Sequence, residues 1–240
     1  METEVRLFAH LACRPELEID LIRTALLVAE IEHNELDVDH WMDEFDHLAE
    51  SAEAYLVHRG AKSDRERVEA LLYYMGTVEK FRGNEEDYYD PRNSFLNDVL
   101  ARRVGIPITL SLIWMEVGLR IGLNAQGIAF PGHFLLQVRS RAGRIIVDAY
   151  NGHVVAESDL RDLYRIATGR DEHPPAEVMR PAKKSEILIR MLANLRAIYR
   201  SRGDDLRLHA VLQRLRALSP GLDVEDELGE VAGERPRLLN

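Results

Sequence analysis

The fold is decided by the stretch NSFLNDVLARRVGIPITLSLIWMEVGLRIGL at residues 93–123, followed by GIAFPGHFLLQV at 127–138 and IIVDAYNG at 145–152. From Ile108 to Ile121 apolar residues occupy nearly every side of a helix, which predicts that this helix is buried in the middle of its domain. Pro107 suits the first turn of that helix and Gly122 suits its end. Strand-like segments follow at residues 125–130, 133–140 and 144–150. One buried helix followed by a small antiparallel sheet predicts an α+β fold.

The regions on either side are predicted to be mainly helical. Apolar residues recur every three or four positions over residues 17–28, 41–55 and 68–78, which indicates amphipathic helices. A short helix is expected over 94–103, and two more over 185–202 and 204–218 are expected to form a hairpin. Residues 165–184 contain Gly and several Pro residues and are interpreted as a linker or a long excursion. The predicted organisation is a helical N-terminal region (1–83), the α+β core (84–165), the helical hairpin (181–220) and a frayed acidic tail (221–240).

Composition narrows the class of protein but identifies no reaction. The 240 residues are 46% hydrophobic and 30% charged, which is typical of a globular domain. The net charge of −10 argues against general nucleic-acid binding, and no apolar run is long enough for a membrane span. No signal peptide is recognised at the N-terminus, and Cys13 is the single cysteine, so a cytoplasmic location is expected. The oligomeric state is left open.

His133 and Asp148 are the candidate functional pair. His133 opens one predicted strand and Asp148 closes the next, so the hairpin is expected to bring them side by side, facing the start of the buried helix. A carboxylate beside an imidazole fixes its tautomer and stabilises its charged form, as a general base requires. The alternative for His133 is a strand-end histidine bonded to the backbone. A metal site formed with His153 is disfavoured, because the spacing matches no compact zinc pattern.

The quoted stretches resemble the transglutaminase-like core of the SirB family, a bacterial family, over about residues 88–152. The resemblance implies a papain-like fold in which a cysteine nucleophile at the start of the central helix faces the His and the Asp. That cysteine lies about fifteen residues before the Gly that ends the helix, and counting back from Gly122 gives Pro107. Proline has no nucleophilic side chain. The resemblance therefore implies that this chain has the family's His and Asp but lacks its nucleophile.

Three other residues are considered as the nucleophile. Thr109 and Ser111 lie in the first turns of the central helix, where the dipole favours a developing anion, and neither is preferred over the other. Hydroxyls at helix starts also commonly bond to the backbone. Cys13 is far along the chain, and a lone cysteine is more often a small buried apolar group.

Asn93, Asn97, Pro107 and Phe130 are candidate residues of a binding cleft. The two asparagines lie one turn apart and either line the cleft or act as a helix cap and a local hydrogen bond. No metal, nucleotide or redox cofactor is predicted, since the sequence has no Walker or dinucleotide glycine pattern.

Three functions remain open. The leading expectation is a protein without the cysteine nucleophile that binds a peptide or protein ligand. The second is a hydrolase or acyltransferase on amide or ester bonds that uses Thr109 or Ser111 with the His–Asp pair. The third is an interaction scaffold, because the C-terminal hairpin resembles a single tetratricopeptide unit, which cannot bury its own apolar face. The alternative for this hairpin is that it only completes the core. The acidic segment 24–58 and the basic segment 183–216 contact each other, contact different partners, or are ordinary solvated faces.

Overall fold

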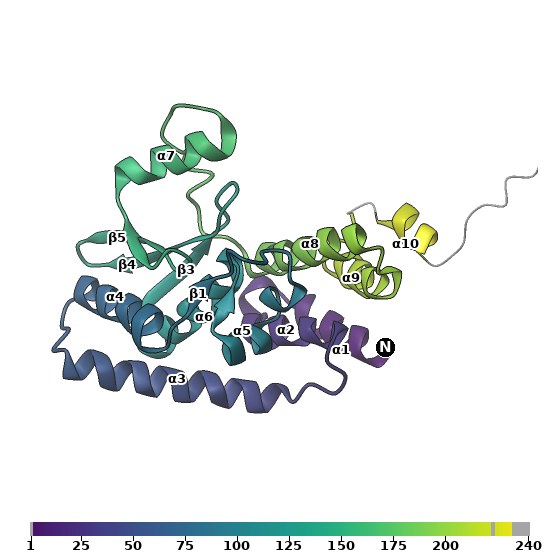
Figure 1. The fold of residues 1–240 in the computed structure, drawn as a ribbon, viewed down its shortest axis with the longest axis horizontal. Helices are drawn as coiled ribbons and strands as arrows, with labels where there is room; N and C mark the ends of the chain where they lie inside the picture. Colours follow the sequence, from purple (N-terminus) through teal and green to yellow (C-terminus); the bar gives the residue numbers. More distant parts are fainter. Residues whose placement is uncertain (1, 222–223, 232–240) are drawn as a thin grey trace, which may run out of the picture. The chain divides into compact units, whose positions relative to one another are not determined.

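The structure, a computed structural model, describes residues 2–221 and 224–231 (Figure 1). The chain divides into two compact units. The helical unit comprises residues 1–38, 89–91 and 183–240, and the sheet unit comprises residues 39–88 and 92–182. These units cross the predicted domain boundaries, because the first helices associate with the C-terminal hairpin and the later ones with the sheet.

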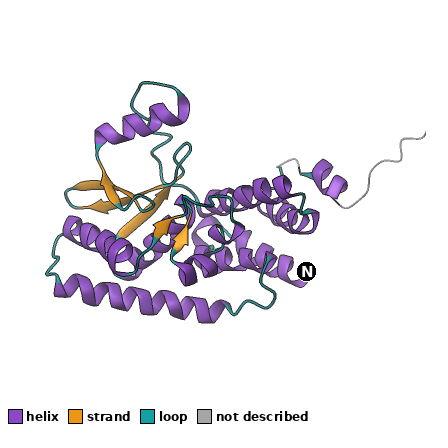
Figure 2. Ribbon diagram, in the orientation of Figure 1, coloured by secondary structure: helices purple, strands orange, loops and turns teal. Residues whose placement is uncertain are grey.

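The sheet unit combines a small antiparallel sheet with helices (Figure 2). Its helices are α3 (Val38–His58), α4 (Asp64–Tyr73), the π-helix η3 (Tyr74–Val78), the 3-10 turn η4 (Pro91–Asn93), α5 (Leu96–Arg102), α6 (Pro107–Arg120) and α7 (Glu157–Thr168). Its strands are β1 (Arg82–Gly83), β2 (Val104–Gly105), β3 (Asn124–Ile128), β4 (Leu135–Ser140), β5 (Gly143–Asp148) and β6 (His153–Val155). Strands β3, β4, β5 and β6 pair antiparallel in that order, while β1 and β2 form a separate parallel pair.

Both faces of the four-stranded sheet are covered. Leu135 and Leu136 point to opposite faces of β4, and both are fully buried. On the Leu135 face, Leu160 and Tyr164 of α7 pack in a cluster with Ile128. Helices α4 and α6 contact the sheet, and Figure 1 shows them on the opposite side from α7. The predicted α+β architecture is therefore present, with α6 at its centre.

The start of α6 is fixed by its own sequence. Ile106 precedes the helix in an extended conformation, and Pro107 occupies the first turn, where its missing N–H costs no hydrogen bond. Thr109 Oγ1 accepts a hydrogen bond from the Ile106 N–H at 3.1 Å, which satisfies a donor at the helix start. The predicted central helix is present as α6, and Trp114 is only 2% exposed, but the helix is not buried on every side, because Leu119 near its end is 45% exposed.

Several predicted elements need correction. His133 lies in the turn before β4 rather than on the strand. Strands β1, β2 and β6 were not expected, because two or three residues are too few to show a period. The segment 165–184 begins inside an unexpected 12-residue helix, α7, and returns to the core at Met179, so it is an excursion rather than a linker.

The helical unit contains α1 (Glu2–Ala12), η1 (Glu16–Glu18), α2 (Leu21–Leu27), η2 (Val28–Ile31), α8 (Lys184–Arg202), α9 (Asp205–Leu218) and α10 (Glu225–Val231). The predicted hairpin is present as α8 and α9, and it packs against α1, α2 and α10. Its apolar residues are buried there, including Leu192, Leu195 and Tyr199. The hairpin therefore completes the core of this unit.

The expectation of a frayed tail is wrong for α10. Glu227 is only 7% exposed, and its carboxylate forms ion pairs with Arg196 and Arg200 of α8. Two arginines thus hold an acidic helix on the hairpin through one buried carboxylate, and the composition of the tail does not reveal this contact. Residues 222–223 and 232–240 of the predicted tail lie outside the described residues.

The acidic and basic segments do contact each other within the helical unit. Glu32 accepts a hydrogen bond from the Tyr199 hydroxyl at 2.8 Å and lies 2.8 Å from Arg207. Cys13 belongs to this unit and is exposed, so its expected burial is wrong; its thiol donates to the Ala217 carbonyl. No helix in the described ranges is both long and apolar enough to cross a bilayer.

Candidate functional site

The predicted pairing of His133 with Asp148 is present in the sheet unit. His133 follows the turn Phe130-Pro131-Gly132, and its N–H donates to the Phe130 carbonyl at 3.2 Å. Asp148 is the last residue of β5. The His133 Nε2 and Asp148 Oδ2 atoms are 2.7 Å apart. The turn and the strand end thus supply an imidazole and a carboxylate in direct hydrogen-bond contact.

The carboxylate of Asp148 is held by the loop that follows it. Oδ1 accepts hydrogen bonds from the backbone N–H groups of Tyr150 and Asn151, both at 3.0 Å, and Oδ2 accepts from the Asn151 side chain at 2.8 Å. Asp148 is 1% exposed. Burial acts to raise the pKa of this carboxyl, but the hydrogen bonds from His133 and Asn151 outweigh it, and the pKa lies below its ordinary value. Asp148 is therefore ionised at neutral pH and orients the imidazole, whose side chain is 13% exposed.

The two candidate hydroxyls at the start of α6 are buried and bonded to the backbone. Thr109 Oγ1 lies 2.7 Å from the Asn93 carbonyl oxygen and donates to it. Ser111 Oγ donates to the Phe134 carbonyl at 3.2 Å, which ties the second turn of α6 to the residue after His133. Both residues are 0% exposed. Pro107, the first residue of α6, is also buried.

The other candidate cleft residues have mainly internal contacts. Asn93 does not cap α5; its side chain donates to the Asp87 carbonyl at 2.8 Å and accepts from Asn84 at 3.1 Å, so it holds the turn before η4. Asn97 is buried, and its Oδ1 has no hydrogen-bond partner in the described part of the chain. Phe130 is fully buried and contacts Tyr164 edge-on at 6.3 Å between ring centroids.

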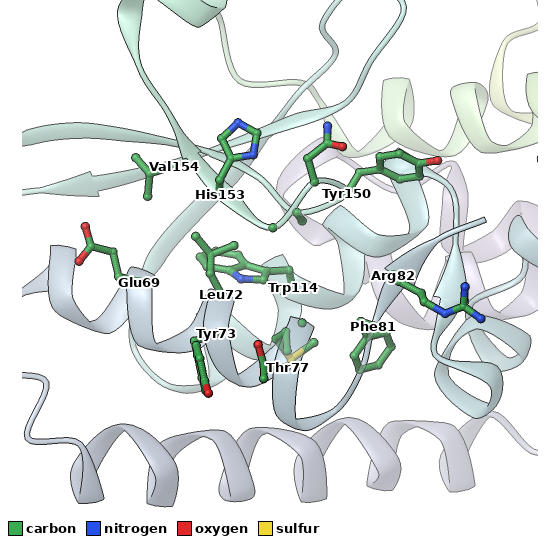
Figure 3. Close-up of a pocket in the computed structure, with 15 residues that line it drawn as sticks. Glu69, Leu72, Tyr73, Thr77, Phe81, Arg82, Trp114, Tyr150, His153 and Val154 are labelled. Carbon is green, nitrogen blue, oxygen red and sulfur yellow. The ribbon is translucent and has the colours of Figure 1, made fainter. Parts of the chain in front are cut away.

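A cavity of about 580 Å³ opens beside the loop that holds Asp148 (Figure 3). It lies between residues 149–154 on one side and the end of α4 with η3 on the other. Figure 3 shows Leu72 and Trp114 at the centre of its lining, with Tyr150 above them and Tyr73 below. Charged and polar groups also line it, namely Glu69, Thr77, Arg82, Asn151 and His153.

Tyr150 separates this cavity from the His–Asp pair. Its ring contacts His133 edge-on, with centroids 6.1 Å apart at 87°. It also packs directly on the backbone of Gly83, where an added Cβ would lie 2.3 Å from the ring. Burial raises the pKa of the Tyr150 hydroxyl, and the nearby Glu85 adds to this effect. Tyr150 is thus a wall shared by the cavity and the pair.

The described residues include no group of three His, Cys, Asp or Glu side chains placed to hold a metal ion.

Comparison with known proteins places this geometry in a family. The model of a family described as the transglutaminase-like superfamily matches residues 39–193, which is more than half of the chain and begins where the sheet unit begins. The chain belongs to the transglutaminase-like superfamily. The match ends within α8 and does not bear on the resemblance of the hairpin to a tetratricopeptide unit, which stays a prediction.

Relatives of this transglutaminase-like protein occur in bacteria and in animals. It is 34% identical over 204 residues to a UPF0162 protein of Xylella fastidiosa, covering 80% of this chain and 69% of the relative. A UPF0162 protein of Pseudomonas aeruginosa is 31% identical over 212 residues, covering 88% and 77% of the two chains. Mouse F-box only protein 21 is 30% identical over 145 residues, 58% of this chain but 22% of that protein. No solved structure matches. The narrower resemblance to the SirB family stays a prediction.

Sequence reasoning found the pair but missed the cavity. Asn151 follows Asp148 by three residues, so an Asx-type turn was a readable signal. No such pattern pointed to Leu72 and Trp114, because apolar residues on a buried helix are expected to belong to the hydrophobic core. Their place at the cavity depends on how α4 and α6 meet the loop after β5.

Proposed function

We propose that the sheet unit of this protein binds a peptide segment at the His133–Asp148 pair without forming a covalent bond to it. The observation that carries the proposal is a complete, partly exposed His–Asp pair. The expected assignment of the nucleophile position to Pro107, the first residue of α6, supports it. The pair is a rigid polar contact suited to the amide groups of a peptide.

The placement of the hydroxyls argues against the covalent alternative. Nucleophilic attack needs a hydroxyl that a substrate can reach and that a general base can deprotonate. Thr109 and Ser111 are 0% exposed, and each donates its proton to a backbone carbonyl. Either residue would have to give up a buried hydrogen bond before it could react, at a cost of about 1–3 kcal/mol.

The buried carboxylate supports a binding role for the imidazole. Asp148 receives hydrogen bonds from Tyr150 and Asn151 in addition to His133, so its position does not depend on a ligand. The histidine is therefore held in one orientation before a peptide arrives. Such preorganisation lowers the entropic cost of binding.

Selection of peptides from a random library on the full chain, followed by calorimetry and mass spectrometry, tests the proposal. We expect His133→Gln to weaken a selected peptide by about tenfold or more, because it removes the contact that the pair presents. The matched control is His173→Gln, since His173 is exposed on the loop after α7 and has only a long contact to Glu157. Bound peptide should be recovered with unchanged mass.

Two results would contradict this proposal. Cleaved or transferred peptide would establish the covalent alternative. Equal affinities of the selected peptide for wild type and for His133→Gln would show that the pair is not part of the binding site.

A cysteine introduced in place of Pro107 tests whether this is the position of the family's nucleophile. In a Cys13→Ser background, Pro107→Cys places the single thiol at the start of α6, where the helix dipole and His133 would lower its pKa. We expect it to react with iodoacetamide at mildly acidic pH, and His133→Ala to slow it. A thiol with ordinary reactivity in a folded variant would show that position 107 is not the nucleophile position.

A further inference from the structure

We propose that the surface of the α8–α9 hairpin that α10 covers is a docking site for an acidic amphipathic helix of a partner protein. In this structure α10 occupies that surface, and its contacts show the chemistry that the surface recognises. The site lies within the helical unit, so the inference does not rest on the peptide binding proposed for the sheet unit.

The contacts of α10 combine apolar burial with charge. Val224 and Leu228 are 1% and 7% exposed, and Glu227 is 7% exposed. The Leu228 N–H donates to the Val224 carbonyl at 2.9 Å, so the helical spacing includes Val224. Positions i, i+3 and i+4 of a helix share one face, so these three side chains form one stripe, which the ion pairs of Glu227 turn toward α8. A helix that replaces α10 therefore needs an acidic residue beside two apolar residues at this spacing.

The hairpin provides more positive charge here than the buried part of α10 neutralises. Oε1 of Glu227 accepts a hydrogen bond from Arg200 Nε at 2.8 Å, and Oε2 accepts one from Arg196. One buried carboxylate thus serves two guanidinium groups. Arg216 of α9 adds a third charge, 3.6 Å from the exposed Glu225. Such a surface complements an acidic helix and repels a basic one.

The sequence of α10 makes it a replaceable occupant. The helix has seven residues and contains Gly229, and a helix of this length is not stable in water by itself, so its helical form depends on the hairpin. Its release leaves no buried cation behind, because the side chains of Arg196 and Arg200 are already 26% and 59% exposed with α10 in place. A longer helix without glycine loses less conformational entropy on binding and therefore competes with α10.

A release variant of the full chain, Val224→Ser/Leu228→Ser, tests the inference. It removes the apolar contacts of α10 and leaves every residue of the hairpin unchanged. The probe is a fluorescent alanine-based helix of about twenty residues with Val, Glu and Leu at the spacing of 224, 227 and 228. We expect fluorescence polarisation to show that the release variant binds the probe about tenfold or more tightly than wild type, because α10 leaves only a fraction of the wild-type surface open.

Matched controls separate the docking site from general charge attraction. A probe with Gln in place of Glu, and one with the same residues in scrambled order, should each bind the release variant at least about fivefold more weakly. Adding Arg196→Gln and Arg200→Gln to the release variant should abolish the gain in affinity. Adding Arg23→Gln instead should leave it unchanged, since Arg23 pairs locally with Asp20 of its own helix start.

Amide exchange of the wild-type chain provides a test that needs no substitution. A saturating concentration of the probe should speed exchange in α10 by about tenfold, because the probe takes its place on the hairpin. Exchange in α8 should not become faster, since the probe covers the same surface. Unchanged exchange in α10 at a concentration that saturates the release variant would contradict the replacement of α10.

The outcomes distinguish this inference from its alternatives. Equal binding of the probe to wild type and to the release variant overturns the docking site and leaves α10 as part of the core. A wild-type dimer that the probe dissociates assigns the surface to α10 of a second copy and overturns the partner helix. Loss of probe binding in His133→Gln would place the probe on the sheet unit and overturn the inference, whereas unchanged binding supports it whether or not the proposed role of His133 holds.

Discussion

Gly83→Ala is expected to displace Tyr150 from its place between the cavity and the pair. The new Cβ would lie 2.3, 2.4 and 2.7 Å from Cζ, Cε2 and Oη of the tyrosine, whereas carbon atoms in contact are about 3.5–4.0 Å apart. The ring must therefore retreat by about 1 Å or more. Because these atoms are at the far end of a side chain, we expect the ring to swing away while the β1–β2 pairing persists.

The expected cost follows from this geometry. Overpacking of this kind destabilises by about 1–3 kcal/mol, and the freedom of the ring places the value near the lower end, about 1–2 kcal/mol. Displacement also exposes the hydroxyl, so the pKa of Tyr150, which burial raises in the wild type, should fall toward its ordinary value.

Urea unfolding followed by tryptophan fluorescence measures this cost, since Trp41 and Trp114 both lie in the sheet unit. In a Tyr150→Ala background, Gly83→Ala should cost less than about 0.5 kcal/mol, because the colliding ring is absent. Gly76→Ala is the matched control, since a Cβ there would meet no atom within 4 Å. Equal costs of Gly83→Ala in both backgrounds would refute the contact with Tyr150.

Three further predictions concern buried polar groups. Asp148→Asn should cost about 1–2 kcal/mol at pH 7. Because the folded-state pKa of Asp148 is lowered, the wild-type advantage should hold above about pH 4 and disappear as the pH falls through that lowered pKa, which urea titrations across a pH series will show. Glu227→Gln should speed amide exchange in α10 by about tenfold, while Glu225→Gln, whose ion pair is exposed, should not change it; comparable effects would contradict the anchoring role of Glu227. Thr109→Val should lower the free energy of unfolding by about 1–3 kcal/mol and leave peptide affinity unchanged, whereas a loss of affinity with unchanged stability would give Thr109 a part in function.

Local patterns were sufficient to predict the long elements. The apolar residues around α6 and the periodicity of α8 and α9 predicted those helices closely, because an amphipathic or fully apolar pattern extends over several turns. The pairing of His133 with Asp148 was expected from the ends of a short hairpin together with the resemblance to a transglutaminase-like core.

Periodic patterns in the sequence did not predict the short strands or the residues that pack against each other. The strands β1, β2 and β6 span two or three residues each, and their pairing is decided by partners distant in the sequence. The burial of Glu227 depends on two arginines of α8, about thirty residues earlier, so the acidic composition of the tail was misleading.

The sequence by itself determined the central helix and the antiparallel hairpin near whose ends His133 and Asp148 lie. These features depend on residue type and on spacings of a few residues, which the chain carries locally. Only the tertiary structure decided that the hydroxyls of Thr109 and Ser111 are bonded to backbone carbonyls, and that Tyr150 packs on Gly83 beside a cavity with Trp114 in its wall. The physical reason is that burial, hydrogen-bond partners and cavities are properties of segments that meet in space, and the separations involved, such as 67 residues between Gly83 and Tyr150, leave no periodic signal in the sequence.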